Sequence, residues 1–158
     1  MPTITPFLWF DADAEEAAEF YVSVFPDARV LGVQRRPPEQ PGADGPALVV
    51  SLELQGQQLS FLNGGPSQRL TEAFSLVANV EGQDEVDRYW DALLEGGGQE
   101  HACGWLKDRF GLSWQIVPGA LLRLMADPDP ARSAAVMDAM LQMVRIDVAA
   151  LQAAYDSV

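Results

Sequence analysis

Residues 4–26 read "ITPFLWFDADAEEAAEFYVSVFP", and this stretch decides the predicted fold. The apolar run over residues 3–10 predicts a strand, and the aspartates in 11–13 offer oxygens that can cap a helix. Over residues 14–25 apolar side chains recur at helical spacing, and the acidic residues near the start suit the helix dipole. The apolar positions are Ala14, Ala17, Ala18, Tyr21 and Phe25. A strand followed by an amphipathic helix is therefore expected.

Three more strands are predicted after this helix. Residues 28–35, "ARVLGVQR", are typical of a strand, and 36–46 hold four prolines and two glycines, which leaves a loop. Residues 47–63 predict a hairpin that turns at Gln55-Gly56. The first half of the chain is thus expected to run strand, helix, strand, strand, strand.

The same pattern then begins again as a weak internal repeat. A shift of 69 residues places Glu15-Glu16 on Asp84-Glu85 and Phe20-Tyr21 on Tyr89-Trp90. A shift of 53 residues places "LSF" at 59–61 on "LSW" at 112–114. The shifts differ because the first half carries the long proline loop, and both matches in the same order indicate a duplicated unit.

The tail after this repeat is predicted to be helical and to mediate assembly. A short helix is expected over 120–126, a second one follows within 127–144, and Asp147 is expected to cap a last one. The second helix presents one apolar face, made of Met137, Met140, Leu141 and Val144. This face favours a homodimer, and whether modules are exchanged between the two chains stays open.

Composition excludes several classes of partner. The formal net charge of −13 disfavours nucleic acid and anionic membrane surfaces. No apolar run approaches the roughly 20 residues of a membrane-spanning helix, and no secretory leader is expected. A single cysteine cannot form an internal disulfide, so a cytoplasmic location is expected.

Four segments together resemble a known family: "ITPFLWFDADAEEAAEFYVSVFP", "LNGGP", "CGWLKDRFGLSWQIVP" and "RIDVAALQAAY". They are similar to the PhnB-like branch of the vicinal oxygen chelate superfamily, often called 3-demethylubiquinone-9 3-methyltransferase. The superfamily includes glyoxalase I, extradiol dioxygenases and bleomycin-resistance proteins. The resemblance implies an α+β fold in which paired βαβββ modules form a curved mixed-sheet cup for a ligand, commonly in a homodimer.

The resemblance also implies a division of the chain. Residues 1–158 are expected to form a single domain, with C-terminal helices appended to the paired modules. The first module is placed at 1–65, the second at 70–118, and the helical extension at 119–158.

Metal-dependent relatives take one ligand from the first and one from the last strand of each module. Alignment with that pattern places Pro6 and Ser75 at the first-strand positions, and Leu62 and Gln115 at the last-strand positions. Proline and leucine have no side-chain donor, and serine and glutamine are weak neutral ligands. We therefore expect no metal and no other cofactor, although a metal enzyme with misplaced ligands stays an alternative.

Strand alternation predicts which side chains line the cup. Leu112, Trp114 and Ile116 are expected to pack under helices, as are Leu59 and Phe61. The expected ligand-binding residues are apolar or uncharged, which suits a small, mostly apolar neutral molecule. They are Leu8, Phe10, Ser60, Leu62, Ser75, Val77, Asn79, Ser113 and Gln115.

Three residues are weak catalytic candidates. Cys103 and His101 lie two residues apart and would share a face if both lay on a strand, and Asp108 could orient the imidazole. The alternative is a small thiol packed beside Gly104, with Lys107-Asp108 as a surface turn. Gln115 either replaces a metal-binding acid or bonds to Ser113 or a buried water, and both interpretations stay open.

The expected function is binding or sequestration of a small molecule without a metal. The alternative is an enzyme of the same superfamily, metal-independent or with an unrecognised metal, and the identity of the ligand is not given by the sequence. The methyltransferase activity in the family name is disfavoured. Its typical fold needs a glycine-rich loop where a helix starts, whereas Gly96–Gly98 follow a predicted helix.

Overall fold

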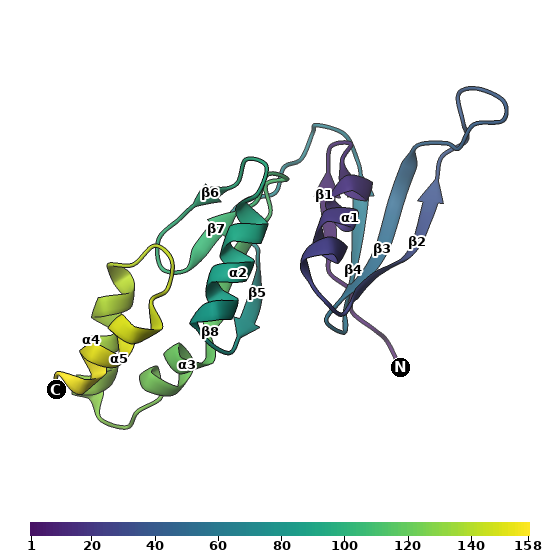
Figure 1. The fold of residues 1–158 in the computed structure, drawn as a ribbon. Coiled ribbons are helices and arrows are strands. Elements are labelled where there is room, and N and C mark those ends of the chain that lie inside the picture. Colours follow the sequence, from purple (N-terminus) through teal and green to yellow (C-terminus); the bar gives the residue numbers. More distant parts are fainter. The chain divides into compact units, whose positions relative to one another are not determined.

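A computed structural model describes residues 1–158, which divide into two compact units, Met1–Leu70 and Thr71–Val158. The first unit contains five elements in the predicted order (Figure 1). They are β1 (Phe7–Phe10), α1 (Ala14–Val24), β2 (Ala28–Arg35), β3 (Ala47–Leu54) and β4 (Gln57–Asn63). The first strand is shorter than predicted, because residues 1–6 adopt no regular structure.

The four strands of the first unit form one mixed sheet in the order β1-β4-β3-β2. β1 runs parallel to β4, whereas β3 is antiparallel to both β4 and β2. The β3–β4 hairpin turns at Gln55 and Gly56, as predicted, with φ angles of 49° and 81°. Such left-handed conformations are typical of two-residue hairpin turns.

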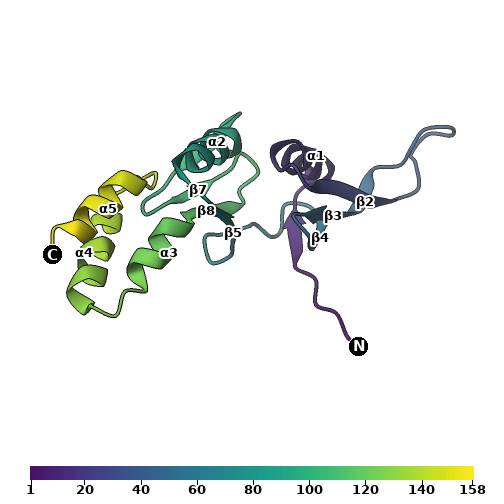
Figure 2. The same ribbon diagram turned by 60° about the horizontal axis from the view of Figure 1, so that its bottom comes forward.

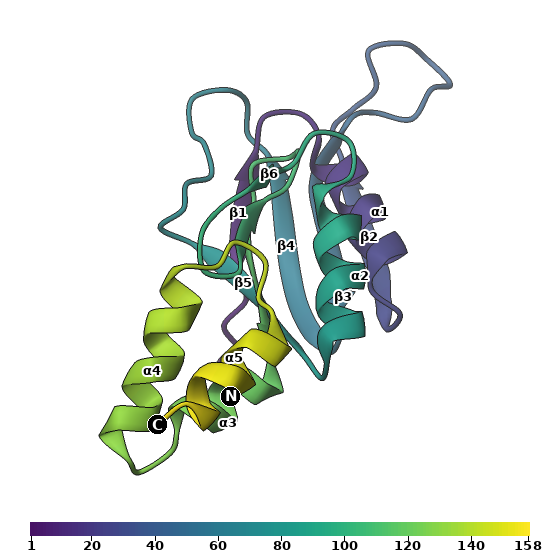
Figure 3. The same ribbon diagram turned by 60° about the vertical axis from the view of Figure 1, so that its left-hand side comes forward.

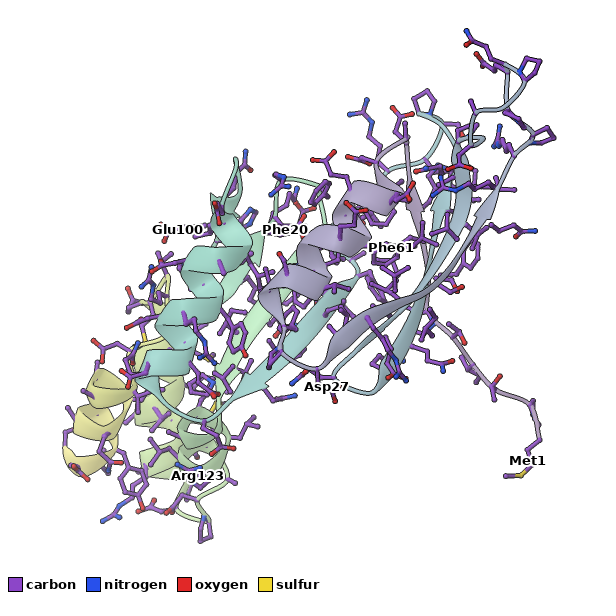
Figure 4. The ribbon with its side chains drawn as sticks, turned by 45° about the vertical axis from the view of Figure 1, so that its right-hand side comes forward. Met1, Phe20, Asp27, Phe61, Glu100 and Arg123 are labelled. Atoms are coloured by element: carbon purple, nitrogen blue, oxygen red, sulfur yellow. The ribbon has the colours of Figure 1, made fainter.

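α1 covers one face of this sheet with its alanine-rich side. Ala14, Ala17 and Ala18 are fully buried, so the helix backbone lies close to the strands. Phe61 of β4 points from the sheet towards α1 (Figure 4). Its ring meets Phe10 at a centroid distance of 4.7 Å and Tyr21 of α1 edge-on at 5.8 Å. Such tilted and edge-on arrangements of aromatic rings are favourable.

The second unit repeats this βαβββ order and adds three helices. Its first part consists of β5 (Ser75–Val80), α2 (Gln83–Leu94), β6 (Gln99–Glu100), β7 (Trp105–Lys107) and β8 (Ser113–Pro118). The strands form a mixed sheet in the order β5-β8-β7-β6, in which β5 is parallel to β8. α2 lies along one side of this sheet (Figure 2) and buries Val86, Trp90 and Leu93.

The tail is helical as predicted, with α3 (Gly119–Met125), α4 (Pro130–Leu141) and α5 (Val148–Asp156) gathered at one end of the second unit (Figure 3). Asp147 caps α5 by accepting a hydrogen bond from the Ala150 amide at 3.0 Å. The helices enclose their own apolar cluster, formed by Leu121, Val136, Ile146 and Leu151. None of the helices has the length and apolar character needed to cross a membrane.

The predicted apolar face of α4 is divided in the structure. Met140 packs against the internal cluster of the tail, whereas Met137, Leu141 and Val144 are exposed. The surface left for a partner is therefore smaller than the four-residue face that the sequence predicts.

Candidate functional site

Each sheet has one face covered by a helix and an opposite face, which we call the distal face. The helix-covered side of the second sheet is the predicted one, because Leu112, Trp114 and Ile116 are all buried. In the first sheet Leu59 and Phe61 are buried against α1, again as predicted. The side chains between them therefore belong to the distal faces.

The prediction for the first strand was wrong. Leu8 and Phe10 were expected to line the cup, but both are buried on the helix-covered side. Leu8 is the register partner of Phe61, and partners in a sheet point to the same face. Phe7 and Trp9 lie on the distal face instead, beside Ser60 and Leu62.

The error has a simple geometric cause. Register equates Phe7↔Ser60 with Ser75↔Ser113, which relates the first strands by 68 residues, whereas the helices are related by 69. Counted from these equivalent positions, α1 begins seven residues after Phe7, whereas α2 begins eight residues after Ser75. Because side chains alternate along a strand, a displacement of one residue exchanges the faces. The first-strand position equivalent to Ser75 is Phe7, and not Pro6.

The distal face of the first sheet is mainly apolar. Trp9, Leu62 and Val49 form one row across β1, β4 and β3, and Phe7, Ser60 and Ser51 form the next. The Trp9 indole donates a hydrogen bond to the Gly65 carbonyl at 2.9 Å. Its ring lies so close to Gly64 that a β-carbon there would approach it to 2.3 Å. Gly64 therefore provides the space in which Trp9 lies.

The distal face of the second sheet is more polar. Ser75, Val77 and Asn79 of β5 share it with Ser113 and Gln115 of β8, as the alternation predicts. Gln115 donates its amide Nε2 to the Ser75 Oγ at 2.9 Å. The amide is thus bonded to the adjacent strand β5, and not to Ser113.

Two residues of this face were missed by the sequence reasoning. Register pairs Trp105 with Gln115 and Lys107 with Ser113, which places both β7 side chains on the distal face. Lys107 forms an ion pair with Glu72. The hydrogen bond from Lys107 is the main cause that lowers the pKa of the Glu72 carboxyl. The alternation of apolar and polar residues in "WLK" was the available sequence signal for a strand. In the structure Leu106 is buried on the helix-covered side, and the half-buried Trp105 and Lys107 point the other way.

Cys103 and His101, the weak catalytic candidates, do not lie together on a strand. Cys103 lies in a turn before β7 with a φ of 60°, and His101 lies after the end of β6. The turn binds the tail: the Cys103 amide donates to the Met143 carbonyl at 2.8 Å and the Gly104 amide to the Val144 carbonyl at 2.7 Å. The backbone of this segment thus has a structural role.

Asp108 was expected at a surface turn beside Lys107, but it is 3% exposed and organises the β7–β8 connection. Its Oδ1 accepts hydrogen bonds from the Phe110 and Leu112 amides at 2.9 and 3.1 Å. Its Oδ2 accepts one from the Trp114 indole at 2.9 Å. Asp108 therefore bonds to the Trp114 indole and fixes its own loop.

The donor set does not fit a catalytic metal. Phe7 and Leu62 offer no donor atoms from the first sheet, and the Ser75 and Gln115 side chains of the second sheet are neutral. Nor do three His, Cys, Asp or Glu side chains gather anywhere in a way that could hold a metal ion. Divalent ions in proteins are usually held by imidazole, thiolate or carboxylate groups.

Two βαβββ units, each with a mixed four-stranded sheet, define the vicinal oxygen chelate class of fold, and the C-terminal helices are added to it. Solved structures of this class are similar to the chain. The FosX fosfomycin resistance protein of Listeria monocytogenes, solved with Mn(II) and sulfate ion, has a TM-score of 0.52 at 12% identity, covering 75% of this chain and 91% of its own. At that identity the similarity concerns the fold alone.

The chain belongs to the 3-demethylubiquinone-9 3-methyltransferase family, whose model matches residues 2–117. A putative 3-demethylubiquinone-9 3-methyltransferase, a PhnB protein from Bacillus cereus, is 28% identical with a TM-score of 0.66, covering 75% of this chain and all of its own. Protein PA1353 from Pseudomonas aeruginosa is 21% identical with a TM-score of 0.60, and the match covers 75% of this chain and 98% of its own. Comparison with curated proteins gives no match. The whole helical tail, which begins with α3 at Gly119, lies beyond the residues that the family model matches.

Proposed function

We propose that the protein binds or sequesters a small, mostly apolar organic molecule on the distal faces of its sheets, without a metal. The observation that carries the proposal is the hydrogen bond between Gln115 and Ser75. Two positions at which metal-dependent relatives place ligands here hold neutral side chains that are bonded to each other. Around them lie apolar side chains that suit an organic ligand, among them Val77 and Trp105.

The location of Cys103 favours binding over thiol catalysis. A nucleophilic cysteine needs an adjacent base and access to the substrate. Cys103 lies in the turn that holds the tail, and not on a strand of the distal face. The enzymatic alternative would be supported if a ligand found by screening were converted to a product.

The methyltransferase activity in the family name has no support from the glycine residues. Gly96 and Gly97 follow the end of α2 and have φ angles of 83° and 126°, which fits a helix C-terminus. Binding of a nucleotide-like cofactor typically needs a glycine-rich loop at the start of a helix that follows a parallel strand.

A thermal-shift screen of metabolites tests the proposed function, with Val77→Glu as the variant and Leu122→Glu as the matched control. Both side chains are exposed, Val77 on the distal face and Leu122 on α3. A ligand at a hundredfold excess over its Kd should stabilise the protein by about 2.7 kcal/mol. We expect Val77→Glu to remove this stabilisation and Leu122→Glu to retain it. Ligands whose effect survives Val77→Glu would place the site elsewhere.

The absence of a metal requirement is tested on untagged, dialysed protein. We expect elemental analysis to find no stoichiometric Zn, Ni, Mn or Fe, and chelator to leave the Tm unchanged. One equivalent of retained metal would contradict the metal-free proposal.

We also propose a cytoplasmic homodimer. The free thiol of Cys103 suits a reducing compartment, and Met137, Leu141 and Val144 leave apolar surface on the tail. Light scattering should give twice the chain mass of 17.2 kDa, and Leu141→Glu should lower it. A monomer at micromolar concentration would contradict the assembly but not the binding function.

A further inference from the structure

Three polar side chains form one row across the distal face of the second sheet. Ser113 of β8 is the register partner of Ser75 on β5 and of Lys107 on β7. Directly paired residues on one face of a sheet have neighbouring side chains. Two hydroxyl groups and one ammonium group are thereby brought together, although they are far apart in the sequence.

Ser113 is the unusual member of this row. Its side chain is nearly inaccessible, with the residue 2% exposed, and its Oγ has no hydrogen-bond partner. Buried hydroxyl groups are almost always hydrogen-bonded, because an unpaired one loses its hydration without compensation. The Ser113 hydroxyl can therefore gain a bond from a ligand atom that displaces the side chains now covering it.

Lys107 supplies a second hydrogen-bond donor, and its positive charge is balanced by Glu72. Its ammonium is paired with Glu72, and the two side chains are 27% and 52% exposed. An ammonium has three N–H groups, so one ion pair leaves others able to donate. Because Glu72 balances the charge and the whole chain carries −13, an added anion would meet unfavourable electrostatics at this place.

The next row of the face is suited to the apolar part of a ligand. It consists of Trp105, Gln115 and Val77, with the Gln115 amide bonded to Ser75. A flat apolar group can pack on Trp105 and Val77, which flank that amide. The polar and apolar rows are two residues apart along each strand.

We propose that Ser113 and Lys107 form a carbonyl-binding subsite, in which the hydroxyl and the ammonium donate to one carbonyl oxygen of a neutral ligand. The apolar part of the ligand then lies on Trp105 and Val77. A carbonyl oxygen accepts two hydrogen bonds through its two lone pairs and adds no charge beside Glu72. This assignment rests on the proposed function and narrows its ligand class to ketones, aldehydes, esters or amides.

Four small probes of similar size separate the possible chemistries: acetophenone, 1-phenylethanol, ethylbenzene and benzoate. Each is titrated into the full ¹⁵N-labelled chain, and amide shifts on β5, β7 and β8 are followed. We expect acetophenone to bind about fivefold or more tightly than ethylbenzene, as one net hydrogen bond predicts. Benzoate should bind more weakly than acetophenone.

Variants assign the preference to the two residues. In Ser113→Ala and in Lys107→Met the acetophenone-to-ethylbenzene ratio should fall towards one, while ethylbenzene binds as before. Ser113→Ala should not lower the Tm, because it removes an unpaired hydroxyl. The matched control is Ser23→Ala, an exposed serine of α1 that lies on neither distal face, which should leave the ratio unchanged.

The outcomes separate this inference from the proposed function. If all four probes bind to the face with equal affinity, small-molecule binding stands and the carbonyl subsite is overturned. Tighter binding of benzoate would replace it with an anion site, and an unchanged ratio in Ser113→Ala would remove Ser113 from recognition. If no probe shifts an amide of this face, the subsite is overturned, whereas the proposed function is decided by the metabolite screen.

Discussion

The two βαβββ units share one topology but differ in what they place opposite their helices. On the helix-covered sides both are apolar, with Phe61 in the first unit and Trp114 in the second at equivalent positions. On the distal sides the row Trp9-Leu62-Val49 corresponds to Val77-Gln115-Trp105. Burial under a helix restricts one face of each sheet to apolar residues, whereas the distal face can hold polar side chains that bind a ligand.

The hairpins preceding the last strands differ as well. In the first unit β3 and β4 are joined by the two-residue turn at Gln55 and Gly56. In the second unit residues 108–112 make a longer connection, held by the buried carboxylate of Asp108. The second unit thus depends on a buried carboxylate, whereas the first depends on backbone conformation and on one exposed hydrogen bond, from the Asp27 amide to the Gln55 Oε1 at 2.8 Å.

The largest expected effect tests the equivalence of the two cores. Trp114→Ala and Phe61→Ala should each lower the free energy of unfolding by about 3–5 kcal/mol, because each removes a large buried aromatic ring. Urea denaturation with a fixed m-value is the measurement. Trp114→Phe, which keeps most of the packing and loses the bond to Asp108, should cost less than Trp114→Ala. A mild effect of Trp114→Ala beside a severe effect of Phe61→Ala would break the equivalence.

A smaller effect tests the difference between the hairpins. Asp108→Asn keeps the side-chain volume but turns an amide NH2 towards the Trp114 indole or towards backbone donors. The free energy of unfolding should therefore fall by about 1.5–3 kcal/mol. Gln55→Gly is the counterpart in the first unit. It removes the exposed hydrogen bond that the Gln55 Oε1 accepts from the Asp27 amide, but glycine readily adopts the positive φ found there, so stability should change by less than about 1 kcal/mol. Equal effects of the two substitutions, measured in the same denaturation series, would contradict the contrast.

The smallest effect tests the distal faces. Gln115→Leu copies the residue of the first unit, keeps the volume approximately, and should leave stability within about 1.5 kcal/mol. It should nevertheless weaken binding of any ligand that the screen identifies. Leu62→Gln makes the reciprocal change on the first sheet, and its effect on binding beside that of Gln115→Leu measures how much each distal face contributes. Unfolding of Gln115→Leu at ordinary temperature would show that the face serves stability rather than binding.

Much of this fold follows from patterns that are local in the sequence. The helical spacing of Ala14, Ala17 and Tyr21, the turn at Gln55-Gly56 and the cap at Asp147 all correspond to the observed elements. These features depend on neighbouring residues, so one stretch of sequence contains the whole signal.

The faces were less predictable where they depended on distant pairing. The helix repeat predicts a shift of 69 residues between the units, but β1 and β5 are related by a shift of 68. Phe7, and not Leu8, therefore lies on the distal face. The same holds for Lys107, whose place beside Ser113 is set by register between β7 and β8. Likewise, the burial of Asp108 depends on an indole six residues away that must fold back onto it.

The turn at Cys103 and Gly104 makes the attachment of the tail measurable. Both amides donate to carbonyls some forty residues later in the chain, so neither can exchange its hydrogen with solvent while the tail stays attached. Exchange of these two hydrogens therefore reports how often the segment around Met143 and Val144 lifts away, independently of unfolding of the sheet itself. Amide exchange rates compared with those of the central β8 strand would show whether the helical tail opens as a separate cooperative unit or only together with the whole second unit.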